Sequence, residues 1–248
     1  MQTITWPTLE PFAWYRRMRD EAPVSYDAER GSWNVFRFDD VKRVLSDYAA
    51  FSSNFSGASG QSDQPLGSSI ISTDPPRHRQ LRSLVTQAFT PRAVQQLAPR
   101  IAALVDELLA GAAQRGHMDI IDDFAYPLPV IVIAELLGIP AQDRAKFKEW
   151  SDAIVTGSVD TTTGSGNVQQ QMGRYFMHLI AARRQEPRDD LISGLLAAEI
   201  DGVHLSEVEL LGFCVLLLIA GNETTTNLIG NAVLCFHEHP ELQAQLRN

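Results

Sequence analysis

The sequence predicts a mainly α-helical protein with one small β-hairpin near its N-terminus. Two observations carry this prediction. Apolar residues recur at three- and four-residue spacing through most of the 248 positions, which is the period of a helix with one buried face. Aromatic and β-branched residues, in contrast, are concentrated in the short runs 24–26 and 33–38, and such runs are typical of strands.

The expected helices are marked by their start and stop residues. Pro75-Pro76 and Pro91 would begin two of them, because the missing N–H of proline has no intrahelical partner in the first turn. Pro23 would end another. Ser206 and Glu209 have the spacing of a capping box, which predicts the start of the last long helix. The expected helices are 8–22, 39–45, 74–89, 90–116, 126–137, 141–156, 168–185, 189–196 and about 206–237.

Strands and loops are few. The two aromatic runs flank the polar turn 29–32, which predicts a hairpin, and residues 118–121 would form one further short strand. Residues 52–69 and 157–167 are mostly small and polar, with too little apolar surface to fix a regular element. We expect the first to be a mobile loop and the second a hinged lid.

Composition and charge exclude several classes of protein. Hydrophobic residues make up 44%, enough for a sizeable core, and acidic residues outnumber basic ones by 30 to 21, which argues against nucleic-acid binding. Cys214 and Cys235 have no metal-ligand or CxxC spacing and are expected to be inert thiols in a reduced cytoplasm. The N-terminus lacks a signal-peptide pattern, and the apolar run 214–220 is far shorter than the roughly 18 residues of a membrane span. We therefore expect a cytoplasmic protein with no membrane partner.

The most unusual segment is 216–226, in the middle of the last long helix. A carboxylate within a helix that is apolar on all faces is costly unless it is paired, hydrated or neutralised, so Glu223 needs a reason. The hydroxyl of Thr224 can bond back to the carbonyl of Ala220, which would bend or open the helix. Gly221 has no side chain, so a large flat group would have room against the backbone.

Ala-Gly-x-Glu-Thr-Thr in a long apolar helix resembles the oxygen-binding helix of cytochrome P450, the haem-thiolate monooxygenase family, in its soluble bacterial type. Arg77-His78-Arg79-Gln80-Leu81-Arg82 resembles the family helix whose His and Arg, four residues apart, bind the haem propionates. The order of elements along the chain resembles the family as well. Either motif alone is only suggestive, whereas the pair is specific.

The resemblance implies a cytochrome P450 fold, haem b (iron protoporphyrin IX) as the cofactor, and a role for each matching residue. Thr224 would hold its hydroxyl beside bound dioxygen, and Glu223, where the family more often has Asp, would relay protons to it through water. His78 and Arg82 would bind the haem propionates, and Ala220, Gly221 and Thr225 would lie along the porphyrin. By analogy, the substrate cavity would be lined by Ile70, Ile71, Phe89, Leu216 and Ile219.

The resemblance also implies how the chain is divided. We expect one haem-monooxygenase domain over 1–248, incomplete at its C-terminal end. Its sections would be an N-terminal helix, hairpin and substrate loop (8–70), the propionate and lid helices (74–205), and the oxygen-binding helix (206–238). The family's iron ligand is a cysteine in a Phe- and Gly-rich loop that follows a Glu-x-x-Arg helix, and neither occurs in these residues. The resemblance thus implies no metal ligand here, a thiolate beyond Asn248, and a chain that is inactive alone.

Two functions remain open. The leading hypothesis is a monooxygenase that hydroxylates or epoxidises a small hydrophobic organic substrate, using dioxygen and two electrons from a separate ferredoxin or flavodoxin and its reductase. The alternative is a non-catalytic helical protein of the same fold that binds a ligand or haem. Simpler explanations also exist for single features. Ala220 and Gly221 suit close helix packing, and His78 with Arg82 suits a solvated basic face.

Overall fold

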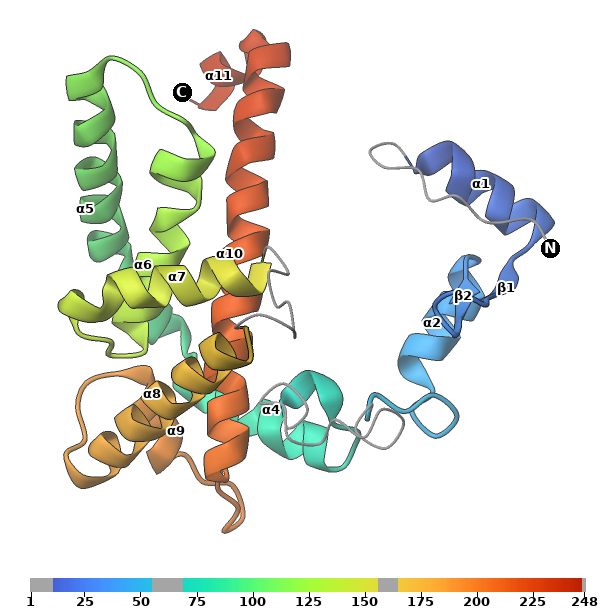
Figure 1. Cartoon of the computed structure of the whole chain (residues 1–248), viewed down its shortest axis with the longest axis horizontal. Coiled ribbons are helices and arrows are strands. Elements are labelled where there is room, and N and C mark those ends of the chain that lie inside the picture. Colours follow the sequence, from blue (N-terminus) through green and yellow to red (C-terminus); the bar gives the residue numbers. More distant parts are fainter. Residues whose placement is uncertain (1–10, 55–68, 156–164, 247–248) are drawn as a thin grey trace. The chain divides into compact units, whose positions relative to one another are not determined.

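The computed structural model describes residues 11–54, 69–155 and 165–246 (Figure 1). It divides into two compact units, Met1–Asn54 and Phe55–Asn248. The expectation of a single domain over the whole chain stays a prediction.

The N-terminal unit is a helix, a hairpin and a second helix, as predicted. Its elements are α1 (Phe12–Glu21), β1 (Val24–Asp27), β2 (Ser32–Val35) and α2 (Phe38–Ser46).

The hairpin is antiparallel and pairs Val24 with Val35 and Asp27 with Ser32. Its turn places Gly31 at a φ of +62°, a conformation that favours glycine. The second strand ends three residues before the predicted run 33–38 does, because Phe38 already belongs to α2.

The second unit is mainly helical in its described residues. Its elements are η2 (Ile70–Ser72), α4 (Arg77–Ala88), α5 (Pro91–Arg115), η3 (Ile121–Ala125), α6 (Pro127–Leu136), η4 (Ala141–Asp143), α7 (Arg144–Val155), α8 (Ser165–Gln185), α9 (Leu191–Ala197), α10 (Glu207–Glu238) and α11 (Pro240–Leu246). The mainly helical fold and the small hairpin predicted from the sequence are thereby confirmed.

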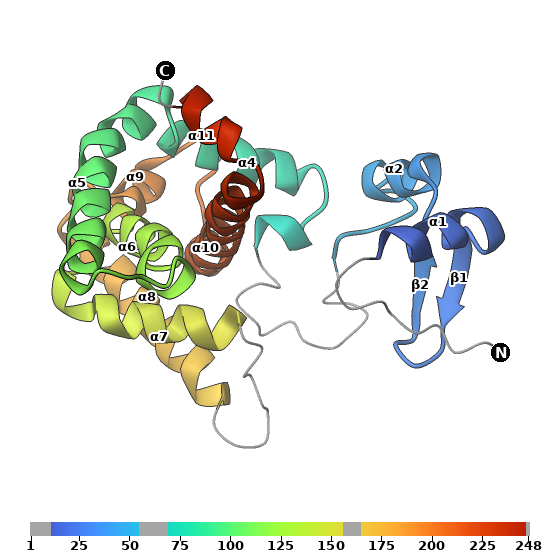
Figure 2. The same ribbon diagram turned by 90° about the horizontal axis from the view of Figure 1, so that it is seen from above.

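The core of this unit lies where α6, α7, α8 and α9 pack against the first half of α10. Figures 1 and 2 both show α6 alongside α10, with α5 on the opposite side of α6. Phe147 of α7 and Phe176 of α8 are fully buried and meet edge to face, with ring centroids 6.1 Å apart. Trp150 of α7 is also buried and meets Tyr175 of α8 at 5.2 Å.

The predicted strand at 118–121 is wrong. Residues Ile121–Ala125 form a turn of π-helix instead, and the residues just before it are not in a strand. Aspartates explain the difference, because the carboxylate of Asp119 accepts the backbone N–H of Ile121 at 2.9 Å. The carboxylate of Asp123 accepts the N–H of Asp119, also at 2.9 Å. These bonds favour a helical turn over an extended backbone.

The two predicted loops fall mainly on residues that lie outside the described part of the chain, namely 55–68 and 156–164. The end of the predicted lid is helical, because α8 begins at Ser165 rather than at 168.

Gly138, just after the end of α6, contacts a buried ion pair between Arg183 and Asp190. Arg183 also donates to the carbonyl of Gly138 at 2.8 Å, and its side chain is only 5% exposed. Gly138 has a φ of +71°, and a Cβ at this position would collide with the carboxylate of Asp190. This close approach explains why Gly138 ends the helix, as the sequence predicts.

Candidate functional site

The helix that carries the central motif is continuous, as predicted. α10 has 32 residues and starts with the predicted capping box. The backbone N–H and the hydroxyl of Ser206 donate to Glu209 Oε2 at 2.9 and 2.8 Å, and the N–H of Glu209 donates to Ser206 Oγ at 3.3 Å.

One face of the middle of α10 is buried against α6 and η3. A Cβ added to Gly221 would lie 2.8 Å from Ile133 Cδ1, and one added to Gly230 would lie 2.8 Å from Ile121 Cδ1. Gly221 therefore serves close packing between α10 and α6, which was the simpler explanation of this glycine. Its predicted place beside the porphyrin stays a prediction.

The opposite face of the same segment is open. Ala220, Glu223 and Thr224 are exposed, and Thr225 is half-buried. The sequence of α10 is apolar on all faces, but in the described residues its packing partners cover only one side of this segment. Burial therefore gives no reason for Glu223 in this structure, and its proposed role depends on the motif.

Thr224 bonds back to the helix as the sequence predicts, and Thr225 does the same. Thr224 Oγ donates to the carbonyl of Ala220 at 2.7 Å, and Thr225 Oγ donates to that of Gly221 at 2.9 Å. α10 nevertheless remains one helix through this segment. The bonds satisfy the hydroxyl protons while leaving the oxygen lone pairs of exposed Thr224 free to accept.

His78 and Arg82 lie one turn apart on α4. His78 is half-buried, Arg82 is exposed, and neither side chain forms a hydrogen bond or ion pair with the described residues. Residues four apart share one face of a helix, so the two side chains can meet the same anionic group.

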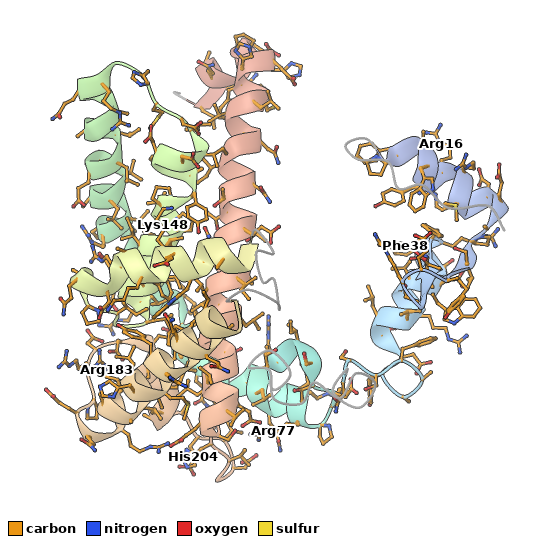
Figure 3. All side chains as sticks on the ribbon, in the orientation of Figure 1. Arg16, Phe38, Arg77, Lys148, Arg183 and His204 are labelled. Carbon is orange, nitrogen blue, oxygen red and sulfur yellow. The ribbon has the colours of Figure 1, made fainter. Side chains whose placement is uncertain are left out.

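Arg77 is the best-bonded residue of this motif, which no local signal in the sequence indicates. Its Nε and Nη2 donate to Glu209 Oε1 and Oε2 at 2.7 and 2.6 Å, and Nη2 also donates to the carbonyl of His204 at 3.3 Å. Figure 3 shows Arg77 and His204 close together where α4 meets the start of α10. Burial acts to raise the pKa of the Glu209 carboxyl, but the hydrogen bonds from Arg77 and Ser206 outweigh it and hold that pKa below its usual value.

A second feature that sequence analysis missed is the buried residue between Gly221 and Glu223. Asn222 has no exposed surface, and its side-chain amide donates to Ser151 Oγ of α7 at 2.8 Å. A polar side chain on an apolar helix does not show, from sequence alone, which distant residue will satisfy it.

The residues expected to line a substrate cavity lie near both helices. η2 packs against α4 and α10, with Ile70 half-buried and Ile71 58% exposed, and Leu216 and Ile219 are half-buried on α10. Phe89 meets Phe213 at 6.2 Å and packs on the core. A cavity of about 580 Å³ lies elsewhere, among α4, α5, α6 and α9.

The two thiols are in contrasting surroundings. Cys214 is fully buried, and burial raises the pKa of its thiol to about 12, whereas Cys235 is exposed. Among the described residues, no group of three or more His, Cys, Asp or Glu side chains is placed to hold a metal ion.

Within the described part of the chain, one helix, α10, is long and apolar enough to cross a membrane by length and composition alone. A third of its most apolar window is buried inside the protein, and core helices of soluble proteins pass the same test. This property is weak support for a membrane location.

The helical fold, the central motif of α10 and the basic motif of α4 together point to one class of mainly helical proteins, the cytochromes P450 that the sequence resembles. Residues 8–159 match the family model described as Cytochrome P450. The chain belongs to the cytochrome P450 family, which confirms the resemblance seen in the sequence.

The chain is 44% identical over 246 residues to the putative cytochrome P450 YjiB of Bacillus subtilis, covering 96% of this chain and 61% of that protein. It is 40% identical over 244 residues to the cyclomarin C epoxidase CymV of Salinispora arenicola, covering 94% and 62%. Among solved structures, substrate-free CYP109E1 from Bacillus megaterium is similar with a TM-score of 0.86 at 42% identity, covering 96% of this chain and 64% of that one. The chain thus spans about three fifths of the length of the curated relatives it matches.

Proposed function

We propose that this chain forms the N-terminal part of a haem-dependent monooxygenase that hydroxylates or epoxidises a small hydrophobic organic substrate with dioxygen and two electrons. The observation that carries the proposal is that the four side chains to which the two motifs assign roles are accessible and form no ion pair within the described part of the chain. His78, Arg82, Glu223 and Thr224 are exposed or half-buried, and none is held in an ion pair by the described residues. All four are therefore available to a cofactor, to water or to substrate.

The residues of α4 fit the carboxylates of haem b. An arginine donates two parallel hydrogen bonds to a carboxylate, and a histidine one turn earlier on the same face adds a third donor. His78 and Arg82 would hold the propionates in this way. When bound, haem supplies the iron chemistry of dioxygen activation, which amino-acid side chains lack.

The residues of α10 suit delivery of protons. Cleavage of the bond in dioxygen takes up two protons, and a carboxylate beside an alcohol can supply them from water. Glu223 is exposed and can exchange protons with water, while Thr224 presents a hydroxyl on the next position of the helix. Ala220 and Thr225 lie within one turn of Thr224 and would border the same space, with Gly221 behind them.

The proposal includes partners and location. An apolar substrate would lie near Ile70, Ile71, Leu216 and Ile219, and the thiolate ligand of the iron would come from a segment other than these residues. Electrons would come from a separate ferredoxin or flavodoxin and its reductase in the cytoplasm, with neither nucleic acid nor a membrane as partner. One relative is named as an epoxidase, which supports oxygen insertion as the reaction class.

Haem retention in the full-length enzyme that contains these residues tests the proposal. Arg82→Ala should weaken haem binding about ten- to hundred-fold, since it removes charged hydrogen bonds to a propionate. Arg92→Ala, an exposed arginine on α5, is the matched control and should retain haem. Equal haem content in the two variants would contradict the propionate role of Arg82.

A second measurement separates the two candidate functions. The reduced enzyme with carbon monoxide should give the absorption spectrum of a thiolate-ligated haem, and substrate should be oxidised when electrons are supplied. Haem that binds without any product from a panel of apolar substrates would favour the non-catalytic alternative.

A further inference from the structure

A chain of buried hydrogen bonds joins the middle of α10 to α7 and η3. The amide of Asn222 donates to Ser151 Oγ at 2.8 Å, and the exposed fractions of these side chains are 0% and 1%. Thr226 Oγ lies 3.2 Å from both Asn222 Oδ1 and the carbonyl of Ala125, either of which can accept its proton. Thr226 is 8% exposed, so water has little access to these hydrogen bonds.

Polar groups at such a site do more to specify the packing than to strengthen it. Apolar side chains of similar volume often stabilise a buried contact equally well, whereas a single buried polar partner left alone is unfavourable. An arrangement in which Asn222 meets Ser151 is therefore favoured over every arrangement in which one of them lacks its partner. A buried asparagine fixes the register of coiled-coil helices for the same reason.

These buried hydrogen bonds fix the rotation of α10 about its own axis. Successive residues of an α-helix are about 100° apart, so Asn222 and Thr226 share one side of α10. Glu223 lies about 100° and Thr224 about 200° further round, and both are exposed. If α10 turned by one residue, Glu223 would enter the buried position of Asn222 and leave Ser151 without its amide partner.

We propose that Asn222 and Ser151 are positioning residues of the candidate site. Their hydrogen bond sets the rotation of α10, and through it the direction in which Glu223 and Thr224 point. The link to oxygen chemistry rests on the proposed function of Glu223 and Thr224, whereas the effect on rotation does not.

Cysteine reactivity in the 248-residue chain tests the rotation directly. The background is Cys235→Ser, because Cys214 is fully buried and unreactive. Glu223→Cys places a probe on the exposed face, and Val215→Cys places one on the buried face, two turns before Asn222. With the hydrogen bonds intact, we expect maleimide to react at least a hundred-fold faster at position 223 than at position 215.

The test variant combines Asn222→Leu with Ser151→Ala, which removes both polar partners together. A general loss of stability would raise reactivity at both probe positions. A turn by one residue lowers the rate at position 223, which enters the buried place of Asn222, and leaves position 215 unreactive in the buried place of Cys214. We therefore expect the ratio of the two rates to fall at least ten-fold through the rate at position 223 alone. Asn231→Leu, an exposed asparagine on the same helix, is the matched control and should keep the ratio.

A matched pair at Ser151 covers the case in which the double variant does not fold. Ser151→Thr keeps the hydroxyl and Ser151→Val removes it at nearly the same volume. The rate ratio should persist with threonine and fall with valine. If both the double variant and the Ser151→Val variant keep the ratio of the rates at positions 223 and 215, apolar packing alone sets the rotation of α10 and the proposal is wrong.

The chemical consequence is measured separately in the full-length enzyme. Ser151→Val should lower the product formed per reduced nicotinamide oxidised, whereas Ser151→Thr should not. A fall in the cysteine ratio without any change in this yield would uphold the positioning of α10 and count against the proposed roles of Glu223 and Thr224.

Discussion

Arg77 and Glu209 join the first turns of α4 and α10 through hydrogen bonds of 2.7 and 2.6 Å. Glu209 completes the capping box with Ser206 through the same carboxylate. One carboxylate therefore starts α10 and anchors the helix on which His78 follows Arg77. Glu209 is 14 residues before Glu223, about 21 Å along α10. The ion pair between Arg77 and Glu209 thus ties the basic motif of α4 to the first turn of α10, at the opposite end of the segment that leads to Glu223.

Loss of this ion pair should destabilise the chain. The Arg77 and Glu209 side chains are 32% and 17% exposed, so Arg77→Met leaves a partly buried carboxylate without its main partner. We expect the free energy of unfolding to fall by about 1–3 kcal/mol. Arg77→Lys should recover only part of this loss, because an ammonium does not form the same two-pronged contact. Urea unfolding measures the change, and Arg79→Met, an exposed neighbour, should have little effect.

The same carboxylate predicts a dependence of stability on pH. Because the folded pKa of Glu209 is lower than its usual 4.5, its stabilising contribution is present above pH 4.5. The contribution is lost as pH falls through the lower folded pKa. Glu209→Gln should therefore be less stable than wild type at pH 7, and its stability should decline less steeply below pH 4.5. If the free energies of unfolding of the two proteins, measured in urea, fell equally steeply below pH 4.5, this prediction would be wrong.

The contact between Gly221 and Ile133 predicts a specific suppressor. Gly221→Ala should destabilise the chain by about 1–3 kcal/mol, because the new Cβ would lie 2.8 Å from Ile133 Cδ1. Adding Ile133→Val removes that methyl group and should restore most of the loss. Gly173→Ala on α8 is the matched control, since no atom lies within 4 Å of its added Cβ. It should stabilise by about 0.5–1 kcal/mol, as alanine favours a helix interior.

Thr224 and Glu223 should control the fate of dioxygen rather than the binding of substrate. In the full-length enzyme, Thr224→Ala loses a hydroxyl but little volume, so electrons still arrive while oxygen leaves as peroxide. Glu223→Gln keeps the shape but loses the titratable proton, which should slow turnover by about 10²-fold. The assay compares product and peroxide with the reduced nicotinamide consumed.

Glu238→Gln, an exposed glutamate near the end of the same helix, is the control for this pair. Wild-type yield and rate in both Thr224→Ala and Glu223→Gln would remove these residues from the proton path. The motif would then be a feature of helix packing.

Local signals in the sequence specify the helices of this protein, whereas the distant contacts of its side chains leave no such signal. The bounds of α10 were predictable because a capping box and an uninterrupted apolar run are local signals. The environment of Glu223 was not, since an apolar helix does not reveal which of its sides the rest of the chain covers. Asn222 and Arg77 escaped notice because their partners, Ser151 and Glu209, lie 71 and 132 positions away in sequence.

The burial of Trp150 gives the second unit its own optical signal. The chain has four tryptophans, and Trp150 is the only one that follows residue 54 in the sequence. Replacing the three earlier tryptophans by phenylalanine would leave a fluorophore in the packed interior, with Tyr175 against its ring and Ser151 as its neighbour in the chain. The emission of that single indole would then follow the unfolding of this unit alone. The fluorophore would also lie next to Ser151, whose hydrogen bond with Asn222 orients α10.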